Sequence, residues 1–273
     1  MPRVIVLTST FLRHQYVVNA LARGLEVAGV WQEEKSFEPM KYAVTPEDGD
    51  VVRAHFDARD ASETEWFGGH AALAVPGACV RRVAPGACSE PAEVAAMQAL
   101  EPDVALVFGT GILRKAFIDA FAGRIINLHL GLSPYYRGAG TNFWPLVNRE
   151  PEYVGATIHY LDEGIDTGPI IAHVRPGMGP GDGPHEIGNR TIVAAAECLA
   201  AAALAHVAGT VMAVPQTRGG RLYQRKDFTA AAVQALYRNF ASGMVAEYLA
   251  HKAERDARLS LISLPSGPFP TPV

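Results

Sequence analysis

The first half of the chain alternates short, continuous apolar runs with longer segments whose apolar residues recur every third or fourth position. Such runs, rich in Val and Ile, are typical of strands buried on both faces of a parallel sheet. They predict strands over residues 4–7, 27–31, 104–108 and 125–130, and a further strand is expected over 79–83. The spaced segments predict helices over residues 14–25, 61–67, 89–100 (with Ser89 as its N-cap) and 114–121. The alternation predicts an α/β fold with a doubly wound, mostly parallel sheet.

The pattern changes after residue 150. Two further strands, over 154–161 and 170–174, are joined by a polar segment that contains two glycines. A long alanine-rich helix over 185–207, a short strand over 219–223 and one or two helices over 229–255 follow. The residues from 259 onward are rich in Pro and Gly and are expected to be extended or loose. We therefore expect a main domain over residues 1–210 and a mainly helical C-terminal extension over residues 211–273.

Composition narrows the class of protein. The 273 residues are 49% hydrophobic and 19% charged, which excludes a disordered chain. The net charge of -4 divides into -8 over residues 1–217 and +4 over residues 218–273, a balance that does not favour nucleic-acid binding. The three cysteines have no metal-binding spacing and are expected to be small buried hydrophobes. No uninterrupted apolar run approaches the ~18 residues of a membrane span, and the N-terminal run is too short for a signal peptide. A soluble, cytoplasmic protein is expected.

Several cofactor motifs are absent from the sequence. Dinucleotide binding needs G-x-G-x-x-G at the first strand-to-helix turn, which here reads TSTF and has no glycine. Gly109 and Gly111 form a bare G-x-G later in the sheet, with Arg114 in place of the third glycine. The sequence has no P-loop, nucleophile elbow or HExxH motif, and the spacing of its histidines defines no metal ligand set. Neither a nicotinamide or flavin cofactor nor a catalytic metal is predicted.

Asn127 and His129 are the first candidates for chemistry. They are two residues apart in a predicted strand, so their side chains share one face near its carboxyl end. Open α/β sheets bind ligands at that edge. An amide and an imidazole held side by side can both donate to an oxyanion that forms on a carbonyl carbon. The alternative is a polar pair that satisfies local backbone groups, and this segment alone leaves both interpretations open.

Asp166 is the second candidate. It lies in the glycine-containing loop between the last two strands, where glycine allows the backbone to approach a ligand. A carboxylate beside His129 would raise the imidazole pKa and keep the ring charged. A turn-forming aspartate is the alternative for this residue.

Three motifs then occur in a fixed order. Asn127 and His129 come first, S-x-Y-x-R-G follows over 133–138, and H-x-x-D-x-G-I-D-T-G-P-I-I follows over 159–171. Together they closely resemble the 10-formyltetrahydrofolate-dependent formyltransferases, which act on glycinamide ribonucleotide, methionyl-tRNA and nucleotide-linked amino sugars. The resemblance implies a Rossmann-like fold over about residues 3–210 and a catalytic triad of Asn127, His129 and Asp166.

The resemblance also implies where the co-substrate 10-formyltetrahydrofolate binds. In the family the pterin lies beside a strand end and contacts backbone groups, which maps here onto Gly109, Thr110, Gly111, Ile112, Leu113, Leu161, Asp162 and Gly164. His159 matches a family position as well, and both a site-lining and a core role stay open for it.

The amine acceptor is less well defined by the sequence. The tRNA enzymes of the family carry a basic barrel of about 100 residues, for which this extension is too short. The first expectation is a nucleotide-linked amino sugar, and the alternative is an amino-acid-derived or natural-product amine such as hydroxyornithine. A 10-formyltetrahydrofolate hydrolase would use the same triad. The sequence leaves open whether the protein forms a homodimer. Candidate acceptor contacts, with ordinary loop surface as the alternative, are His14, Gln15, Tyr136, Arg137 and Asn142.

Overall fold

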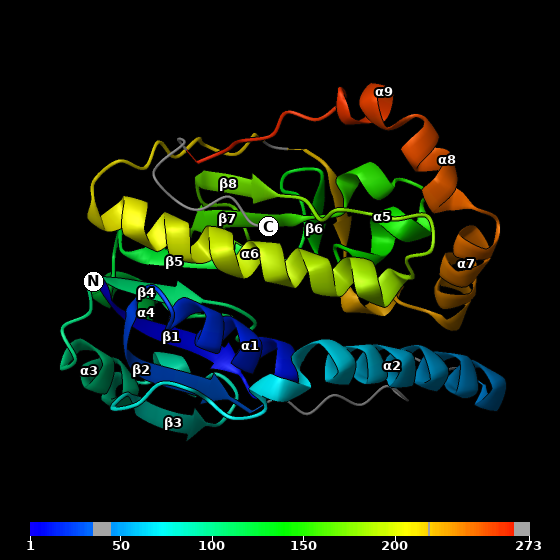
Figure 1. The fold of residues 1–273 in the computed structure, drawn as a ribbon. Coiled ribbons are helices and arrows are strands. Elements are labelled where there is room, and N and C mark those ends of the chain that lie inside the picture. Colours follow the sequence, from blue (N-terminus) through cyan, green and yellow to red (C-terminus); the bar gives the residue numbers. More distant parts are fainter. Residues whose placement is uncertain (35–44, 218, 265–273) are drawn as a thin grey trace.

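The computed structural model describes residues 1–34, 45–217 and 219–264, and its centre is a seven-stranded sheet (Figure 1). In spatial order the strands are β3 (Cys79–Val83), β2 (Glu26–Glu33), β1 (Arg3–Ser9), β4 (Val104–Val107), β5 (Ile125–His129), β7 (Ala156–Tyr160) and β8 (Ile170–Val174). The pairs from β3 to β5 are parallel, whereas β7 and β8 join antiparallel. The predicted mostly parallel α/β sheet is confirmed.

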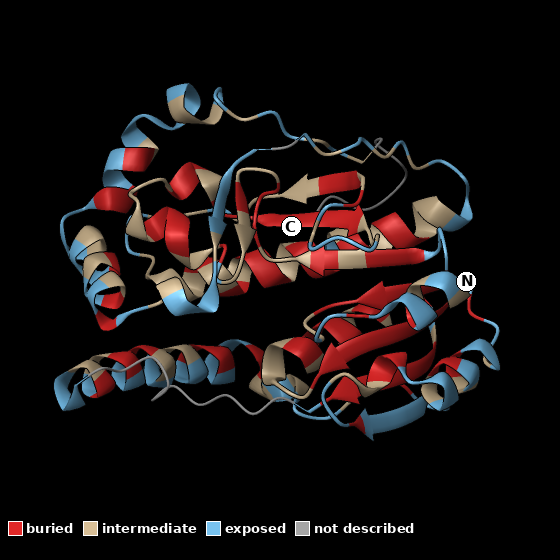
Figure 2. Ribbon diagram, turned by 180° about the vertical axis from the view of Figure 1, so that it is seen from behind, coloured by how far each residue is buried: buried red, intermediate tan, exposed pale blue. Residues whose placement is uncertain are grey.

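Helices cover both faces of the sheet. Alternate residues of β1 point to opposite sides, so Val4 and Val6 enter one core and Ile5 and Leu7 enter the other. The first core is closed by α1 (Leu12–Leu21) and α6 (Pro184–Val207), and the second by α3 (Pro91–Gln98) and α4 (Lys115–Ala120). Burial on both faces explains why β4 and most of β1 are continuously apolar, whereas the edge strand β3 is mostly exposed (Figure 2).

The helix α6 is long and apolar enough to span a membrane by length and composition alone. Its buried residues include Ile192, Ala195, Ala196 and Leu199, which recur at helical spacing and belong to the first core. The apolar side of α6 is therefore packed on the sheet.

The helix α2 (Pro46–Phe67) is much longer than the short helix predicted over 61–67, and that prediction was wrong in extent. Thr45 caps it: the Thr45 hydroxyl accepts from Asp48 N, and the Asp48 carboxylate accepts from Thr45 N. This reciprocal capping box, followed by Pro46 at the first helical position, fixes the start of the helix. Figure 1 shows α2 projecting beyond the sheet, beneath α7.

The N-cap predicted for α3 was also wrong. Glu90 occupies the N-cap position, and Ser89 lies in a preceding turn of 3-10 helix. The Ser89 hydroxyl instead accepts from the backbone N–H of Arg114, at the start of α4, at 2.8 Å. It ties the two helices on this face together.

The chain after residue 210 packs on the main sheet and on its loops. Val214 bridges to Ile170 of β8, and the short strand β9 (Arg221–Tyr223) pairs in parallel with β6 (Tyr136–Gly138). The helices that follow are α7 (Ala230–Ala241), α8 (Met244–Ala250) and α9 (Lys252–Asp256). α7 packs on α2 and on α5 (Phe143–Val147). The boundary at residue 210 stays a prediction.

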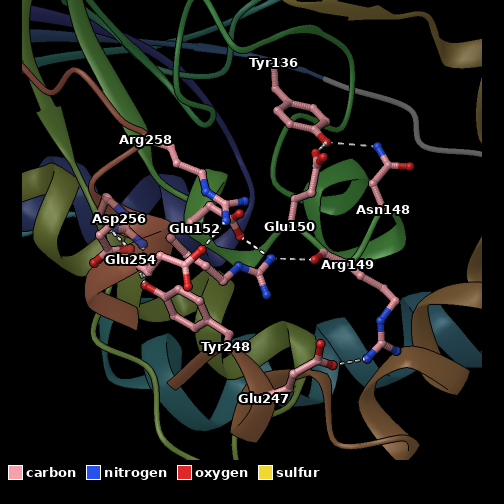
Figure 3. Close-up of polar contacts among 12 residues, drawn as sticks. Tyr136, Asn148, Arg149, Glu150, Glu152, Glu247, Tyr248, Glu254, Asp256 and Arg258 are labelled. Atoms are coloured by element: carbon pink, nitrogen blue, oxygen red, sulfur yellow. Dashed lines mark hydrogen bonds and ion pairs between the residues drawn. The ribbon is translucent and has the colours of Figure 1, made fainter. Parts of the chain in front are cut away.

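A network of polar contacts fixes the last helices to the body of the protein (Figure 3). Arg255 donates to Glu152 at 2.5 Å and to the carbonyl of Arg149 at 2.7 Å, and Arg149 pairs with Glu247 at 2.5 Å. Beyond α9, His173 of β8 exchanges hydrogen bonds with Ile262, so the chain runs extended along that strand. The rest of the Pro- and Gly-rich end, residues 265–273, lies outside the described residues.

Thr157 fixes the turn that follows β5. Its buried hydroxyl donates to the carbonyl of Gly131 at 2.6 Å and accepts from the N–H of Ser133 at 2.9 Å. We expect Thr157→Val to lower the free energy of unfolding by about 1–3 kcal/mol, because two buried backbone groups lose their partner without a change of shape. Urea unfolding measures this. The exposed Thr210→Val is the matched control, expected within about 0.5 kcal/mol of wild type; equal stabilities would contradict this role.

Candidate active site

The pairing of β5 with β7 brings the predicted polar residues together. In this antiparallel register Asn127 lies opposite His159, and His129 lies opposite Thr157. Asn127 and His129 project from the same face of β5, near its carboxyl end, and both line one cavity. The face they share is the one expected from their spacing.

Asn127 is held by His159. The side-chain Nδ2 of Asn127 lies 2.9 Å from His159 Nε2, and His159 Nδ1 lies 2.8 Å from the carbonyl of Tyr160. A carbonyl can only accept, so His159 Nδ1 carries a proton, and in its neutral form Nε2 accepts from the Asn127 amide. The second N–H of Asn127 is left for a ligand. His159 thus lines the cavity and is at the same time almost fully buried.

Asp166 completes the group from the loop between β7 and β8. Its backbone has a φ of 52°, a left-handed conformation that Asp tolerates better than most residues. Its Oδ2 lies 3.3 Å from His129 Nδ1, and its Oδ1 lies 3.7 Å from His159 Nε2. Gln216, from beyond residue 210, donates to the carbonyls of Asp166 and Gly168 at 2.9 and 2.7 Å and supports the loop.

The charge of His129 differs from the sequence-based expectation. Burial lowers the pKa of His129 more than Asp166 raises it, and His159 lowers it further. The net pKa is below the ordinary value, so the imidazole is neutral at pH 7, with Nδ1–H toward Asp166. For Asp166, burial raises the carboxyl pKa, but the two imidazoles beside it lower it overall, so the carboxylate stays charged.

Thr141 lies at the other nitrogen of His129. Its hydroxyl is 3.2 Å from His129 Nε2 and also contacts the carbonyl of Leu130. A hydroxyl that donates to this carbonyl can accept from Nε2–H only when the imidazole is protonated. Thr141 can therefore stabilise a charged His129 formed during a reaction.

One cavity of about 1080 Å³ contains this group and extends on both sides of it. All eight residues predicted to contact folate line it: Gly109, Thr110, Gly111, Ile112, Leu113, Leu161, Asp162 and Gly164. Gly109 has a φ of 79°, and a Cβ there would lie 2.2 Å from His14. Only glycine lets the backbone lie this close to His14.

The carboxylate of Glu33 and that of Asp162 shape the backbone at this end of the cavity. Glu33, buried at the end of β2, accepts from the N–H groups of Gly86 and Gly111. Asp162 accepts from Gly164 N at 3.0 Å and from the Thr167 hydroxyl at 2.8 Å. Both carboxylates therefore fix the conformation of loops that line the cavity.

The residues predicted to contact the acceptor are dispersed. His14 and Asn142 line the cavity, but His14 is 3% exposed, and the side-chain Oδ1 of Asn142 accepts from Gly155 N. Gln15, Tyr136 and Arg137 are not among the lining residues.

Each of those three has a partner elsewhere. Gln15 donates to the carbonyl of Thr10, Arg137 to that of Gly219, and Tyr136 is buried against Glu150 and Asn148 (Figure 3). These contacts turn Gln15 and Tyr136 toward other loops, whereas Arg137, although outside the cavity lining, is near enough to Asp166 for its charge to lower the pKa of that carboxyl.

Sequence reasoning missed a set of aromatic residues at the opposite end of the cavity. They come from four segments far apart in the chain: His55, Phe56, Phe143, His185 and Phe228. The T-P-E-D sequence at residues 45–48 is a helix-start signal and could have predicted α2, which carries His55 and Phe56. No signal in the sequence relates the four segments. Among the described ranges, no group of three or more His, Cys, Asp or Glu side chains is arranged to hold a metal ion.

Comparison with known proteins identifies the family of the chain. The model of the formyl transferase family matches residues 3–203, so the chain belongs to the formyl transferase family. The methionyl-tRNA formyltransferase of Sorangium cellulosum is 44% identical over 79 residues, which are 29% of this chain and 25% of that protein. The phosphoribosylglycinamide formyltransferase of Escherichia coli is 34% identical over 87 residues, or 32% of this chain and 41% of that protein. The chain thus matches less than half the length of these relatives.

Solved structures share the fold at low identity. A formyltransferase from Anoxybacillus kamchatkensis, in complex with UDP-4,6-dideoxy-4-formamido-L-AltNAc and tetrahydrofolate, aligns with a TM-score of 0.50 and 18% identity. The alignment covers 85% of this chain and 97% of that one.

His55 and His185 flank the hydroxyl of Tyr237, each at 3.2 Å. Burial lowers the pKa of His55 to about 3, helped by His185 and Arg59, and burial lowers that of His185 to about 4. Both rings are therefore neutral at pH 7.

The pH dependence of stability tests this. A histidine in the unfolded chain has a pKa near 6.5, whereas that of folded His55 is about 3. Between these two pH values His55 is protonated in the unfolded chain and neutral in the folded one. Stability therefore falls as the pH drops below 6.5. From pH 7 to pH 5 the free energy of unfolding of wild type should fall by about 1–2 kcal/mol more than that of His55→Gln. Urea unfolding at both pH values, with the exposed His251→Gln as control, measures it; identical losses in wild type and His55→Gln would refute a neutral, buried His55.

Proposed function

We propose that this chain transfers the formyl group of 10-formyltetrahydrofolate to a primary amine of a small molecule. The observation that carries the proposal is the meeting of Asn127, His129 and Asp166 in one cavity with the backbone of residues 109–113. Membership of the formyl transferase family supports the reaction class. The tetrahydrofolate bound to the Anoxybacillus protein supports the choice of donor.

The first half of the reaction uses Asn127 and His129 directly. The neutral amine attacks the formyl carbon, a C–N bond forms, and the carbonyl electrons move to oxygen. The free N–H of Asn127 donates to this oxyanion as its charge develops. His129 takes a proton from the new ammonium at Nε2, which carries the lone pair when Nδ1–H points to Asp166.

The second half returns that proton. The imidazolium of His129 is stabilised by the Asp166 carboxylate at 3.3 Å and by the Thr141 hydroxyl at 3.2 Å. It donates to the folate nitrogen as the bond from that nitrogen to the formyl carbon breaks and the carbonyl reforms. The products are the formamide and tetrahydrofolate, and His129 is neutral again.

For the acceptor, a nucleotide-linked amino sugar is the first candidate, and the formamido sugar in the Anoxybacillus complex supports it. An amino-acid-derived amine such as hydroxyornithine is the alternative. Transfer to methionyl-tRNA is less favoured, because the described residues after 210 form short strand β9 and helices α7 to α9 and include no barrel. Hydrolysis of the donor would need the same three residues with water in place of the amine.

Substitution of the triad tests the mechanism. His129→Ala and Asn127→Ala should each lower kcat by about 10²–10³, because each removes a group that acts on the tetrahedral intermediate. The assay follows tetrahydrofolate release and formamide formation by mass spectrometry over a panel of amines. His251→Ala, an exposed histidine on the extension, is the matched control and should keep wild-type rates.

The same assay separates the alternatives. Tetrahydrofolate release without amine would favour a hydrolase. Retention of more than about a tenth of the activity in either triad variant would contradict the mechanism.

A further inference from the structure

The cavity has a second end, walled by aromatic rings, that the chemistry of the triad does not use. Phe228 lies 4.9 Å from Phe143 and 5.5 Å from Phe56 between ring centroids. His55 lies within 6.0 Å of Phe228 and 4.9 Å from His185. We call these five residues the aromatic compartment.

The aromatic compartment adjoins the triad. Phe143 follows two residues after Thr141, whose hydroxyl is 3.2 Å from His129 Nε2. Residues of the folate-side loops, the triad and the compartment all line this same cavity. A molecule whose amine reaches His129 from the side opposite the folate loops therefore has its remaining atoms against these rings.

The polar groups of the compartment carry no net charge. Its two imidazoles are neutral and share the Tyr237 hydroxyl. Two cations on the lining pair with carboxylates: Arg13 with Glu63 at 2.5 Å, and Arg59 with Asp60 at 2.7 Å, whereas Arg225 lies at an exposed position on the lining. The surroundings therefore suit an uncharged group better than a phosphate or carboxylate.

The C-terminal extension supplies one of these rings. Phe228 precedes α7, which also carries Tyr237, while the facing rings come from α2, α5 and the start of α6. The described part of the C-terminal extension thus forms one wall of the cavity.

We propose that the aromatic compartment binds a flat, uncharged ring carried by the amine acceptor, stacked on Phe228, so that the C-terminal extension selects the acceptor. This rests on the proposed formyl transfer. Stacking on aromatic side chains is tolerant of ring type, so the ring is either an aryl group a short chain away from the amine or the base of a nucleotide-linked amino sugar.

The test compares matched amines in the formyl-transfer assay. 2-Phenylethylamine and 2-cyclohexylethylamine have the same chain and amine, but only the first has a flat, aromatic ring. A UDP-linked 4-amino sugar represents the nucleotide source. In wild type, kcat/KM for the phenyl compound or the UDP-sugar should exceed that for the cyclohexyl compound by about tenfold or more. Phe228→Leu and Phe56→Leu should reduce that ratio to near one. A ratio cancels any loss of folded enzyme, so a purely structural role of these rings would leave it unchanged.

The controls identify the source of the ring. Trp66→Leu replaces an aromatic residue of α2 that does not line the cavity and should keep the wild-type ratio. Arg225 lines the cavity as an exposed residue, so Arg225→Gln should weaken only the UDP-sugar if its phosphates lie there. The proposal would be overturned if both phenylalanine variants kept the wild-type ratio. It would also be overturned if the wild type preferred 2-cyclohexylethylamine to both 2-phenylethylamine and the UDP-sugar.

Binding without turnover separates this proposal from the proposed function. If no amine accepts a formyl group, formyl transfer fails, and equilibrium dialysis with labelled 2-phenylethylamine and UDP still tests the compartment. Binding of either probe that weakens about tenfold in Phe228→Leu and not in Trp66→Leu supports it. The proposal is refuted if wild type, Phe228→Leu and Trp66→Leu bind each probe equally well, or if none of them binds either probe.

Discussion

The chemistry of the cavity depends on the contact between His129 Nδ1 and Asp166 Oδ2. The two residues lie on different elements, at the end of β5 and in the loop after β7, and the antiparallel pairing of these strands brings them within 3.3 Å. The contact sets which nitrogen of His129 carries the proton, and hence which one faces the reacting atoms. Burial of the same ring keeps it neutral until a proton arrives from the substrate. The orientation of the His129 ring and its pKa thus both depend on its burial beside Asp166.

The structure surrounds this contact with supports of different origin. His159 orients Asn127, Thr141 lies at the far nitrogen of His129, and Gln216 holds the backbone of Asp166. Gln216 and Phe228 both follow residue 210, so the last quarter of the chain both supports Asp166 and forms part of the aromatic wall of the cavity. Its position on one wall of the cavity suits a role in choosing the acceptor.

The sequence predicted the sheet well, because strands buried on both faces must be continuously apolar. It underestimated α2, whose few buried residues, including Val52, His55 and Phe67, form no continuous apolar stripe along its exposed length. The shared face of Asn127 and His129 follows from the two-residue period of a strand. The neutral state of His129 could not be predicted, because it depends on how much burial outweighs one nearby carboxylate. The aromatic compartment was equally hidden, since its rings converge only in the folded chain.

The protonation of His129 tests the account most directly. Imidazole ¹⁵N NMR of the labelled full chain, with the signal assigned by loss in His129→Gln, reports both the tautomer and the pKa. We expect a neutral Nδ1–H ring at pH 7, with a pKa below the ordinary value of 6.5 that falls further in Asp166→Asn, because the carboxylate raises it. A charged His129 at pH 7, or a pKa that does not respond to Asp166→Asn, would contradict the account.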